Sequence, residues 1–159
     1  IYEISIHTRT GKQMYTGEAD KQVFTKIAPL LKASLAYNSD LYRVEDFQEL
    51  KQRSPDISTI MLGRGALIDP FLPAKIKGLQ LPENPKAHLK LFLDDLYYAY
   101  RKAKNDNLSI VSILKEYWSY LALGFEEPIK INRKLKKLKG FEAYEDAVNS
   151  IFDLYNLKP

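Results

Sequence analysis

A strand-like segment near the middle of the chain is followed directly by a glycine-rich turn. It reads Ile57-Ser58-Thr59-Ile60-Met61-Leu62-Gly63-Arg64-Gly65-Ala66. The apolar run from Ile57 to Leu62 is short and is bounded by turn-forming residues, which is typical of a buried strand. The two glycines end this strand, and a short helix is expected over residues 66–76. The stretch therefore predicts a strand, a glycine-rich loop and a helix in succession.

Two further units of the same kind precede this stretch. A strand over residues 2–7 is followed by a polar loop over 8–17 and by a helix that Asp20 is suited to cap. That helix carries apolar residues at helical spacing: Val23, Phe24, Ile27, Leu30 and Leu31. A second strand over 34–38 leads to a helix with Val44, Phe47 and Leu50 on one face. Three such units in a row predict a parallel sheet.

A parallel sheet of three strands would leave both edge strands uncovered. The pattern therefore fits the last three βα units of an eight-stranded TIM (β/α)8 barrel better than a free-standing fold. Residues 81–85 form a linker, and everything beyond it is expected to be helical. Three apolar stripes there predict a bundle of helices. We therefore expect an α/β segment over residues 1–80 and an all-α domain over 81–159.

Bulk composition limits the possible functions. The chain has 159 residues and a net charge of +4, which is compatible with a polyanionic partner. It has no cysteine, so no disulfide, zinc thiolate or cysteine nucleophile can come from it. We expect no metal site, no membrane segment and a cytoplasmic protein. The chain opens in the middle of a strand, so we expect it to be a piece of something longer.

Polar residues capable of chemistry follow each predicted strand. They are His7-Thr8-Arg9-Thr10, Asn38-Ser39-Asp40 and Gly63-Arg64-Gly65. Active sites of TIM barrels lie at the C-terminal strand ends, and the loops after the last two strands commonly hold a phosphate. Gly63 and Gly65 would let the backbone approach an anion, the next helix would offer N–H groups, and Arg64 would add charge. The coincidence of the three groups at successive strand ends predicts a shared site.

These three blocks resemble the tRNA-dihydrouridine synthase family. Residues 7–10 and 15–20 look like its pattern H-x-R-T … Y-x-G-x-A-D, and residues 38–41 and 45–46 look like N-G-D-I … E-D. Residues 61–67 with Pro70 and Phe71 resemble M-I-G-R-G-A … N-P-W. The resemblance covers residues 1–78, and it continues more loosely through 115–120 and through Arg133-Lys134.

The resemblance implies an FMN site. In the family, the residue matching His7 contacts the phosphate region, and the residue matching Asn38 holds the flavin. The residues matching Gly63 and Arg64 bind the phosphate, together with the backbone amide of Gly65. Asp40 belongs to the same motif as Asn38 and is expected among the cofactor-binding residues.

Several departures from the family pattern accompany this resemblance. Ser39 replaces the usual glycine, and Asp69 replaces a common asparagine. The family's proton-donating cysteine and flavin-contacting lysine are expected upstream, in the remainder of the barrel. We therefore expect no catalytic residue in this segment and no activity from this chain alone.

A basic strip over residues 130–139 is the candidate nucleic-acid surface. Six of its ten residues are basic and none is acidic. On the residues alone, RNA phosphate contact and a solvated helix face are equally supported. The resemblance implies a helical domain that binds tRNA, which favours RNA. The candidate contacts are Arg9, Lys130, Arg133, Lys134, Lys136 and Lys137. Tyr98 is expected on the surface, Trp118 in the core and His88 exposed.

The activity implied for the intact enzyme is the reduction of specific uridines in tRNA to 5,6-dihydrouridine. Reduced FMN would pass a hydride to C6 of a flipped-out base, a cysteine would protonate C5, and NADPH would reduce the flavin. Two alternatives remain open. One is another FMN-dependent TIM-barrel oxidoreductase that acts on free pyrimidines, and the other is a non-catalytic RNA-binding fragment. Tight, salt-sensitive tRNA binding would count against the first.

Overall fold

The computed structural model describes residues 1–14 and 16–159, and the chain forms two compact units. The first unit comprises residues 1–66 and 71–79, and the second comprises 67–70 and 80–159. Tyr15, which belongs to the first motif above, lies outside the described residues. Within the described residues, no helix is long and apolar enough to cross a membrane.

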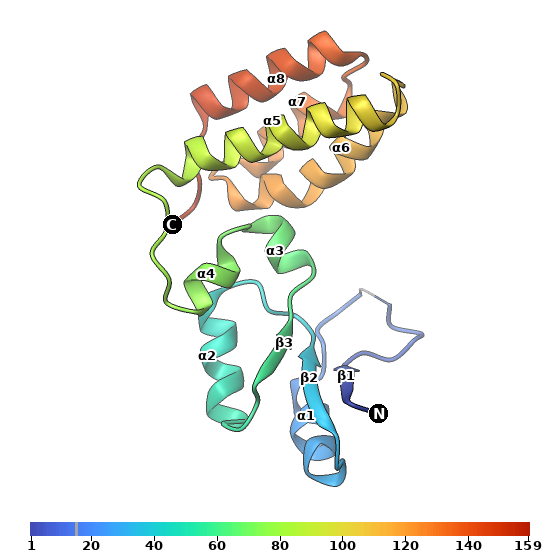
Figure 1. Cartoon of the computed structure of the whole chain (residues 1–159), viewed down its shortest axis with the longest axis vertical. Coiled ribbons are helices and arrows are strands. Elements are labelled where there is room, and N and C mark those ends of the chain that lie inside the picture. Colours follow the sequence, from blue (N-terminus) through green and yellow to red (C-terminus); the bar gives the residue numbers. More distant parts are fainter. Residues whose placement is uncertain (15) are drawn as a thin grey trace. The chain divides into compact units, whose positions relative to one another are not determined.

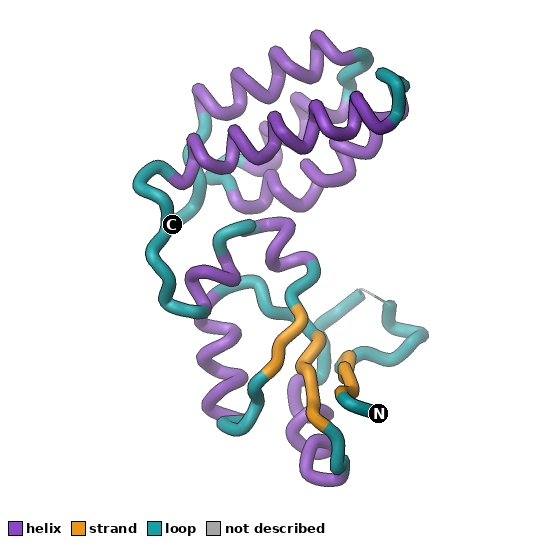
Figure 2. Tube along the Cα trace, viewed as in Figure 1, coloured by secondary structure: helices purple, strands orange, loops and turns teal. Residues whose placement is uncertain are grey.

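A three-stranded parallel sheet is the centre of the first unit (Figures 1 and 2). Its strands are β1 (Glu3–His7), β2 (Ser34–Asn38) and β3 (Thr59–Met61), in that order. The predicted parallel arrangement is thus confirmed, although β3 is shorter than the apolar run over 57–62. In the register of the sheet, His7 is opposite Asn38 and Asn38 is opposite Met61. The carboxyl ends of all three strands therefore meet at one edge.

Local sequence signals explain where the helices of this unit begin and end. Helix α1 (Lys21–Ile27) is capped as predicted, because the Asp20 carboxylate accepts a hydrogen bond of 3.0 Å from the backbone N–H of Gln22. It passes into the 3₁₀ turn η1 (Ala28–Leu30) at Pro29, so Leu30 leaves the apolar face and is 78% exposed. Helix α2 (Val44–Arg53) follows β2.

The prediction of a single helix over residues 66–76 is wrong. The chain instead forms two short helices, α3 (Arg64–Ile68) and α4 (Leu72–Ile76). Pro70 explains the break, because proline lacks a backbone N–H and disfavours helical geometry at the preceding residue.

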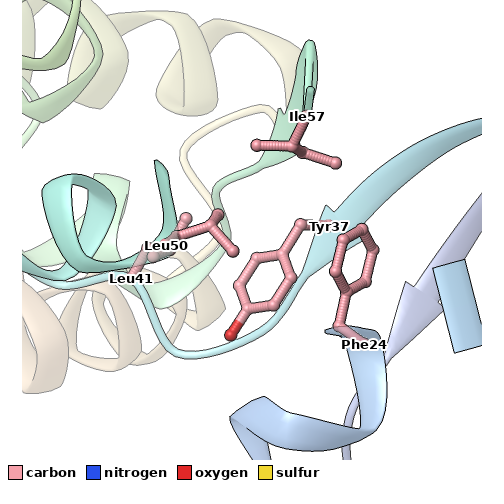
Figure 3. Close-up of a cluster of buried hydrophobic side chains, with 5 residues drawn as sticks. All are labelled: Phe24, Tyr37, Leu41, Leu50 and Ile57. Atoms are coloured by element: carbon pink, nitrogen blue, oxygen red, sulfur yellow. The ribbon is translucent and has the colours of Figure 1, made fainter. Parts of the chain in front are cut away.

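The core of the first unit lies between the sheet and its helices (Figure 3). Phe24 from α1 and Tyr37 from β2 meet edge to face, with ring centroids 5.1 Å apart. Three more buried side chains complete the cluster: Leu41, Leu50 and Ile57. Ile6 and Ile60 are register partners of Tyr37 and pack against the same cluster. Because side chains alternate along a strand, the opposite face of the sheet carries His7, Asn38 and Met61.

The second unit is built from the helices α5 (Pro85–Ala103), α6 (Ser109–Leu121), α7 (Pro128–Lys136) and α8 (Phe141–Leu154), with the 3₁₀ turn η2 (Ala122–Gly124) after α6 (Figure 1). The predicted stripes supply most of the buried side chains. These include Leu89, Leu93, Tyr97, Val111, Leu114, Trp118, Leu121, Tyr144, Val148, Ile151 and Phe152. Phe92, although apolar, is 53% exposed. The buried indole N–H of Trp118 donates to the Tyr144 hydroxyl at 3.1 Å.

Candidate functional site

The first part of the candidate site is a row of side chains at the carboxyl edge of the sheet. His7, Asn38 and Met61 are register neighbours on adjacent strands, so their side chains lie side by side on one face. His7 is exposed and Asn38 is half-buried. Within the part of the chain that the structure describes, neither side chain forms a hydrogen bond. Both are therefore able to bind a ligand.

Asp40 joins the loops that follow the three strands. Arg9 approaches its carboxylate at two points, with Nη1 2.7 Å from Oδ1 and Nη2 2.5 Å from Oδ2. Arg64 Nη2 donates to Oδ1 at 2.8 Å, and the Tyr42 hydroxyl donates to Oδ1 at 3.0 Å. Three of these contacts fall on Oδ1 and one falls on Oδ2, so the internal partners use most of the acceptor capacity of the carboxylate. The geometry gives Asp40 a positioning role between the loops, and the cofactor contact expected from the sequence stays a prediction.

The electrostatics of this cluster keep it charged at neutral pH. Burial alone raises the pKa of Asp40, but hydrogen bonds from Arg9 and Tyr42 and the charges of Arg9 and Arg64 lower it below its ordinary value. Burial, followed by the hydrogen bond to Asp40, raises the pKa of Tyr42, which stays a neutral donor. The Arg64 guanidinium lies 5.5 Å from the centre of the Tyr42 ring.

Arg9 lies inside this cluster and not on an open surface. Its side chain is 4% exposed, and its Nη2 also donates to the backbone carbonyl of Gly17 at 2.7 Å. Arg9 thus fixes the loop after β1 to Asp40, and direct contact with RNA would require these bonds to break. The neighbouring hydroxyls of Thr8 and Ser39 are 2.7 Å apart. The Ser39 backbone does not have a positive φ, so serine replaces the family's usual glycine there without strain.

The two glycines of the third loop have different roles. A Cβ on Gly65 would lie 2.0 Å from the carbonyl oxygen of Leu41, so a side chain there is excluded by backbone packing. A Cβ on Gly63 would meet nothing within 4 Å. Gly63 is therefore the glycine whose surroundings leave room for a ligand, whereas Gly65 serves the fold.

Helix α7 carries the second candidate site. It buries Ile131 and Leu135. The exposed basic residues at spacing i, i+3, i+4 and i+7 share one helix face, which we call the basic face: Lys130, Arg133, Lys134 and Lys137. Lys136 is also exposed and lies beside this face.

The basic side chains of α7 differ in their local partners. Lys130 pairs with Glu127 at 2.8 Å, and Lys134 donates to the Ser150 hydroxyl. Arg133, Lys136 and Lys137 have no side-chain partner among the described residues. The basic face is thus exposed to solvent, as both interpretations of the sequence require, and it is also the surface that would contact RNA phosphates. Tyr98 is exposed and Trp118 is buried, as predicted, and His88 is exposed.

One polar network in the second unit was not predicted from the sequence. Arg101 donates to the Tyr97 hydroxyl at 3.1 Å and to Glu145 at 3.3 Å. Its guanidinium also lies 4.5 Å from the centre of the Phe141 ring. The network connects α5 to α8, so we assign it to stability. The only signal in the sequence is the i, i+4 spacing of Tyr97 and Arg101 on one helix face.

Comparison with known proteins agrees with these features. The sequence matches the family model described as Dihydrouridine synthase (Dus) over residues 1–153. It is 32% identical over 74 residues to a tRNA-dihydrouridine(16) synthase of Cupriavidus necator, covering 46% of this chain and 23% of that protein. It is 28% identical over 100 residues to a probable tRNA-dihydrouridine synthase of Rhizobium leguminosarum bv. phaseoli, covering 59% and 31%.

A third relative is a tRNA-dihydrouridine(16) synthase of Ralstonia nicotianae, 30% identical over 80 residues, covering 50% of this chain and 24% of that protein. The matched regions thus span less than a third of each of these relatives. The family match, by contrast, extends through the sheet and nearly all of the helical unit. The chain therefore belongs to the dihydrouridine synthase family.

Proposed function

We propose that this chain forms the flavin-phosphate end of a cytoplasmic tRNA-dihydrouridine synthase, together with a helical domain that binds tRNA. The sheet would provide the last three βα units of a TIM barrel, and the part of the protein upstream would provide the other strands. One observation carries the proposal. Residues from three successive parallel strands and their loops converge at one edge of the sheet: His7, Asn38 and Arg64 with Asp40. TIM barrels place their active sites at this edge.

The residues at this edge suit the phosphate and ring of FMN. His7 and Asn38 offer polar side chains that form no hydrogen bonds within the described part of the chain. Gly63 leaves open space at the start of the third loop, and the backbone amide of Gly65 follows it. The guanidinium of Arg64 favours an anion, since bonds between guanidinium and phosphate are charge-assisted.

The chemistry of the reaction would belong to the cofactor and to residues upstream. When bound, reduced FMN supplies the hydride that reduces the uracil ring, and NADPH restores the reduced flavin. The residues of this chain bind and orient the cofactor. The chain has no cysteine, so the family's proton-donating cysteine would come from the upstream part.

Charge on the helical unit supports RNA as the partner. The basic face of α7 gathers cations on successive turns of one helix. Its neighbour α8 exposes acidic side chains instead: Glu142, Asp146 and Asp153. A polyanion would therefore bind along α7 and be repelled from α8. An enzyme acting on free pyrimidines would not need such a surface.

The flavin half of the proposal is tested with the complete protein that carries this chain. We expect the purified protein to release FMN on denaturation, and Arg64→Ala to lower its flavin content. Arg53→Ala is the matched control, because Arg53 is exposed on α2 and pairs only with Glu49, at 3.5 Å, among the described residues. A protein without FMN, or equal flavin content in Arg64→Ala and Arg53→Ala, would contradict the proposed site.

A further inference from the structure

We propose that Asp40 is a positioning residue that holds Arg64 in one orientation and so gives the flavin site its preference for a phosphorylated flavin. This inference rests on the proposed function, because it concerns the same flavin-phosphate site. It goes beyond that function by assigning the preference to a residue that acts through Arg64.

The contacts of Arg64 show how its direction is set. Its side chain is long, and it is 26% exposed at the start of α3. Asp40 Oδ1 accepts a hydrogen bond from its Nη2 at 2.8 Å, and the Tyr42 ring lies 5.5 Å from the guanidinium. These two contacts hold the guanidinium from two directions. Bidentate recognition of phosphate requires such a fixed plane.

Asp40 can hold Arg64 because it is itself fixed. The two-point ion pair with Arg9 joins it to the loop after β1, at 2.7 Å and 2.5 Å. Arg9 is in turn bound to the carbonyl of Gly17 and is almost fully buried. A continuous series of contacts therefore runs from the loop after β1, through Asp40, to the arginine at the proposed phosphate position.

Neutralising Asp40 would have two opposing effects. The cluster would gain net positive charge, which attracts a phosphate from a distance. Arg64 would lose one of the contacts that orient its guanidinium, which weakens a geometry-dependent contact. We infer that the loss of a fixed orientation of Arg64 outweighs the gain in positive charge. If charge alone mattered, Asp40→Asn would strengthen the preference for FMN, so the sign of the change separates the two explanations.

The test compares FMN with riboflavin, which lacks only the phosphate. Affinities of the flavin-free complete protein are measured by fluorescence titration for wild type, Asp40→Asn, Asp40→Glu and Asp56→Asn. Asp56 is exposed in the loop before β3 and serves as the matched control. We expect Asp40→Asn to lower the ratio of the riboflavin Kd to the FMN Kd about tenfold, the effect of one charge-assisted hydrogen bond.

The other variants and the second ligand keep the test decisive. We expect the riboflavin Kd to stay within about twofold, which shows that the fold is retained. Asp40→Glu keeps the charge but displaces Arg64, so we expect a smaller decrease in the ratio of the two Kd values. If Asp40→Asn does not fold, the Asp40→Glu variant takes its place in the test. An unchanged or increased ratio in these variants, beside a wild type that prefers FMN, overturns the inference. A wild type without that preference instead overturns the proposed phosphate site itself.

Discussion

The basic face of α7 makes a quantitative prediction about RNA binding. The change is the double substitution Arg133→Gln and Lys137→Gln. Both side chains are exposed on this face and have no side-chain partner among the described residues, so their replacement breaks no internal contact. Glutamine is also a good helix former, so we expect α7 to persist. The substitution thus removes two cations from the proposed RNA surface and little else.

The expected size follows from counterion release. Each phosphate contact contributes about 0.7 to 0.9 to the slope of log K against log salt concentration, so losing two flattens the slope by about 1.4 to 1.8. Between about 50 and about 200 mM salt, wild-type affinity should therefore fall roughly tenfold more than that of the double variant. The assay is a fluorescence anisotropy titration of the full chain with an unmodified tRNA transcript over this salt range.

A control with the same charge change separates location from net charge. Lys102→Gln with Lys104→Gln also removes two exposed cations, but from the end of α5. We expect its slope to stay close to that of wild type. A wild-type slope in the α7 variant, or equal flattening in both double variants, would refute the reasoning that α7 holds the phosphates.

Further predictions concern the fold and the cluster. Gly65→Ala should destabilise the complete protein by at least about 1–3 kcal/mol in thermal melting, because its Cβ would lie 2.0 Å from the Leu41 carbonyl oxygen. Gly63→Ala should leave the melting temperature unchanged, and equal melting of the two variants would contradict this. Tyr144→Phe removes the acceptor of the Trp118 indole and should cost about 1–3 kcal/mol in urea unfolding followed by tryptophan fluorescence. Tyr155→Phe should differ from wild type by less than about 0.5 kcal/mol, and an equal loss in both tyrosine variants would count against a specific bond. The pKa of Asp40 is lowered, so its stabilising contribution is complete above the unfolded value of about 3.9 and is lost as pH falls through the lower folded value. Acid titration of the melting temperature should therefore show a shallower acid limb in Asp40→Asn, and an unchanged limb would be inconsistent with the ion pairs. Residues 1–78 alone should show no cooperative unfolding transition, because both outer edges of the sheet are unpaired within the described residues.

The parts of the fold that could be predicted from sequence depend on local signals. Alternating apolar residues identify β1, short apolar runs identify β2 and β3, and Asp20 identifies the start of α1, because these signals involve neighbours in the chain. The end of α1 before Leu30 and the break between α3 and α4 also have local causes, in Pro29 and Pro70. The spacing of apolar residues alone does not indicate that α1 ends at Pro29 or that Pro70 separates α3 from α4.

The internal role of Asp40 could not be predicted from local signals. It depends on partners 31 residues upstream and 24 residues downstream, which meet only because parallel strands bring their carboxyl ends together. Gly65 shows the same limit, because the sequence suggests an approach to a ligand whereas its neighbour is the Leu41 backbone. The cofactor contacts of His7, Asn38, Asp40, Gly63, Arg64 and the Gly65 amide stay predictions.

The most direct test of the central claim is the dihydrouridine content of tRNA. An unmodified tRNA transcript is incubated with NADPH and the complete FMN-loaded protein, wild type or Arg64→Ala, and the nucleosides are measured by mass spectrometry. We expect dihydrouridine with wild type, a strong loss with Arg64→Ala, and none with residues 1–159 alone. Dihydrouridine formed at the wild-type rate by Arg64→Ala, or by this chain alone, would contradict that claim.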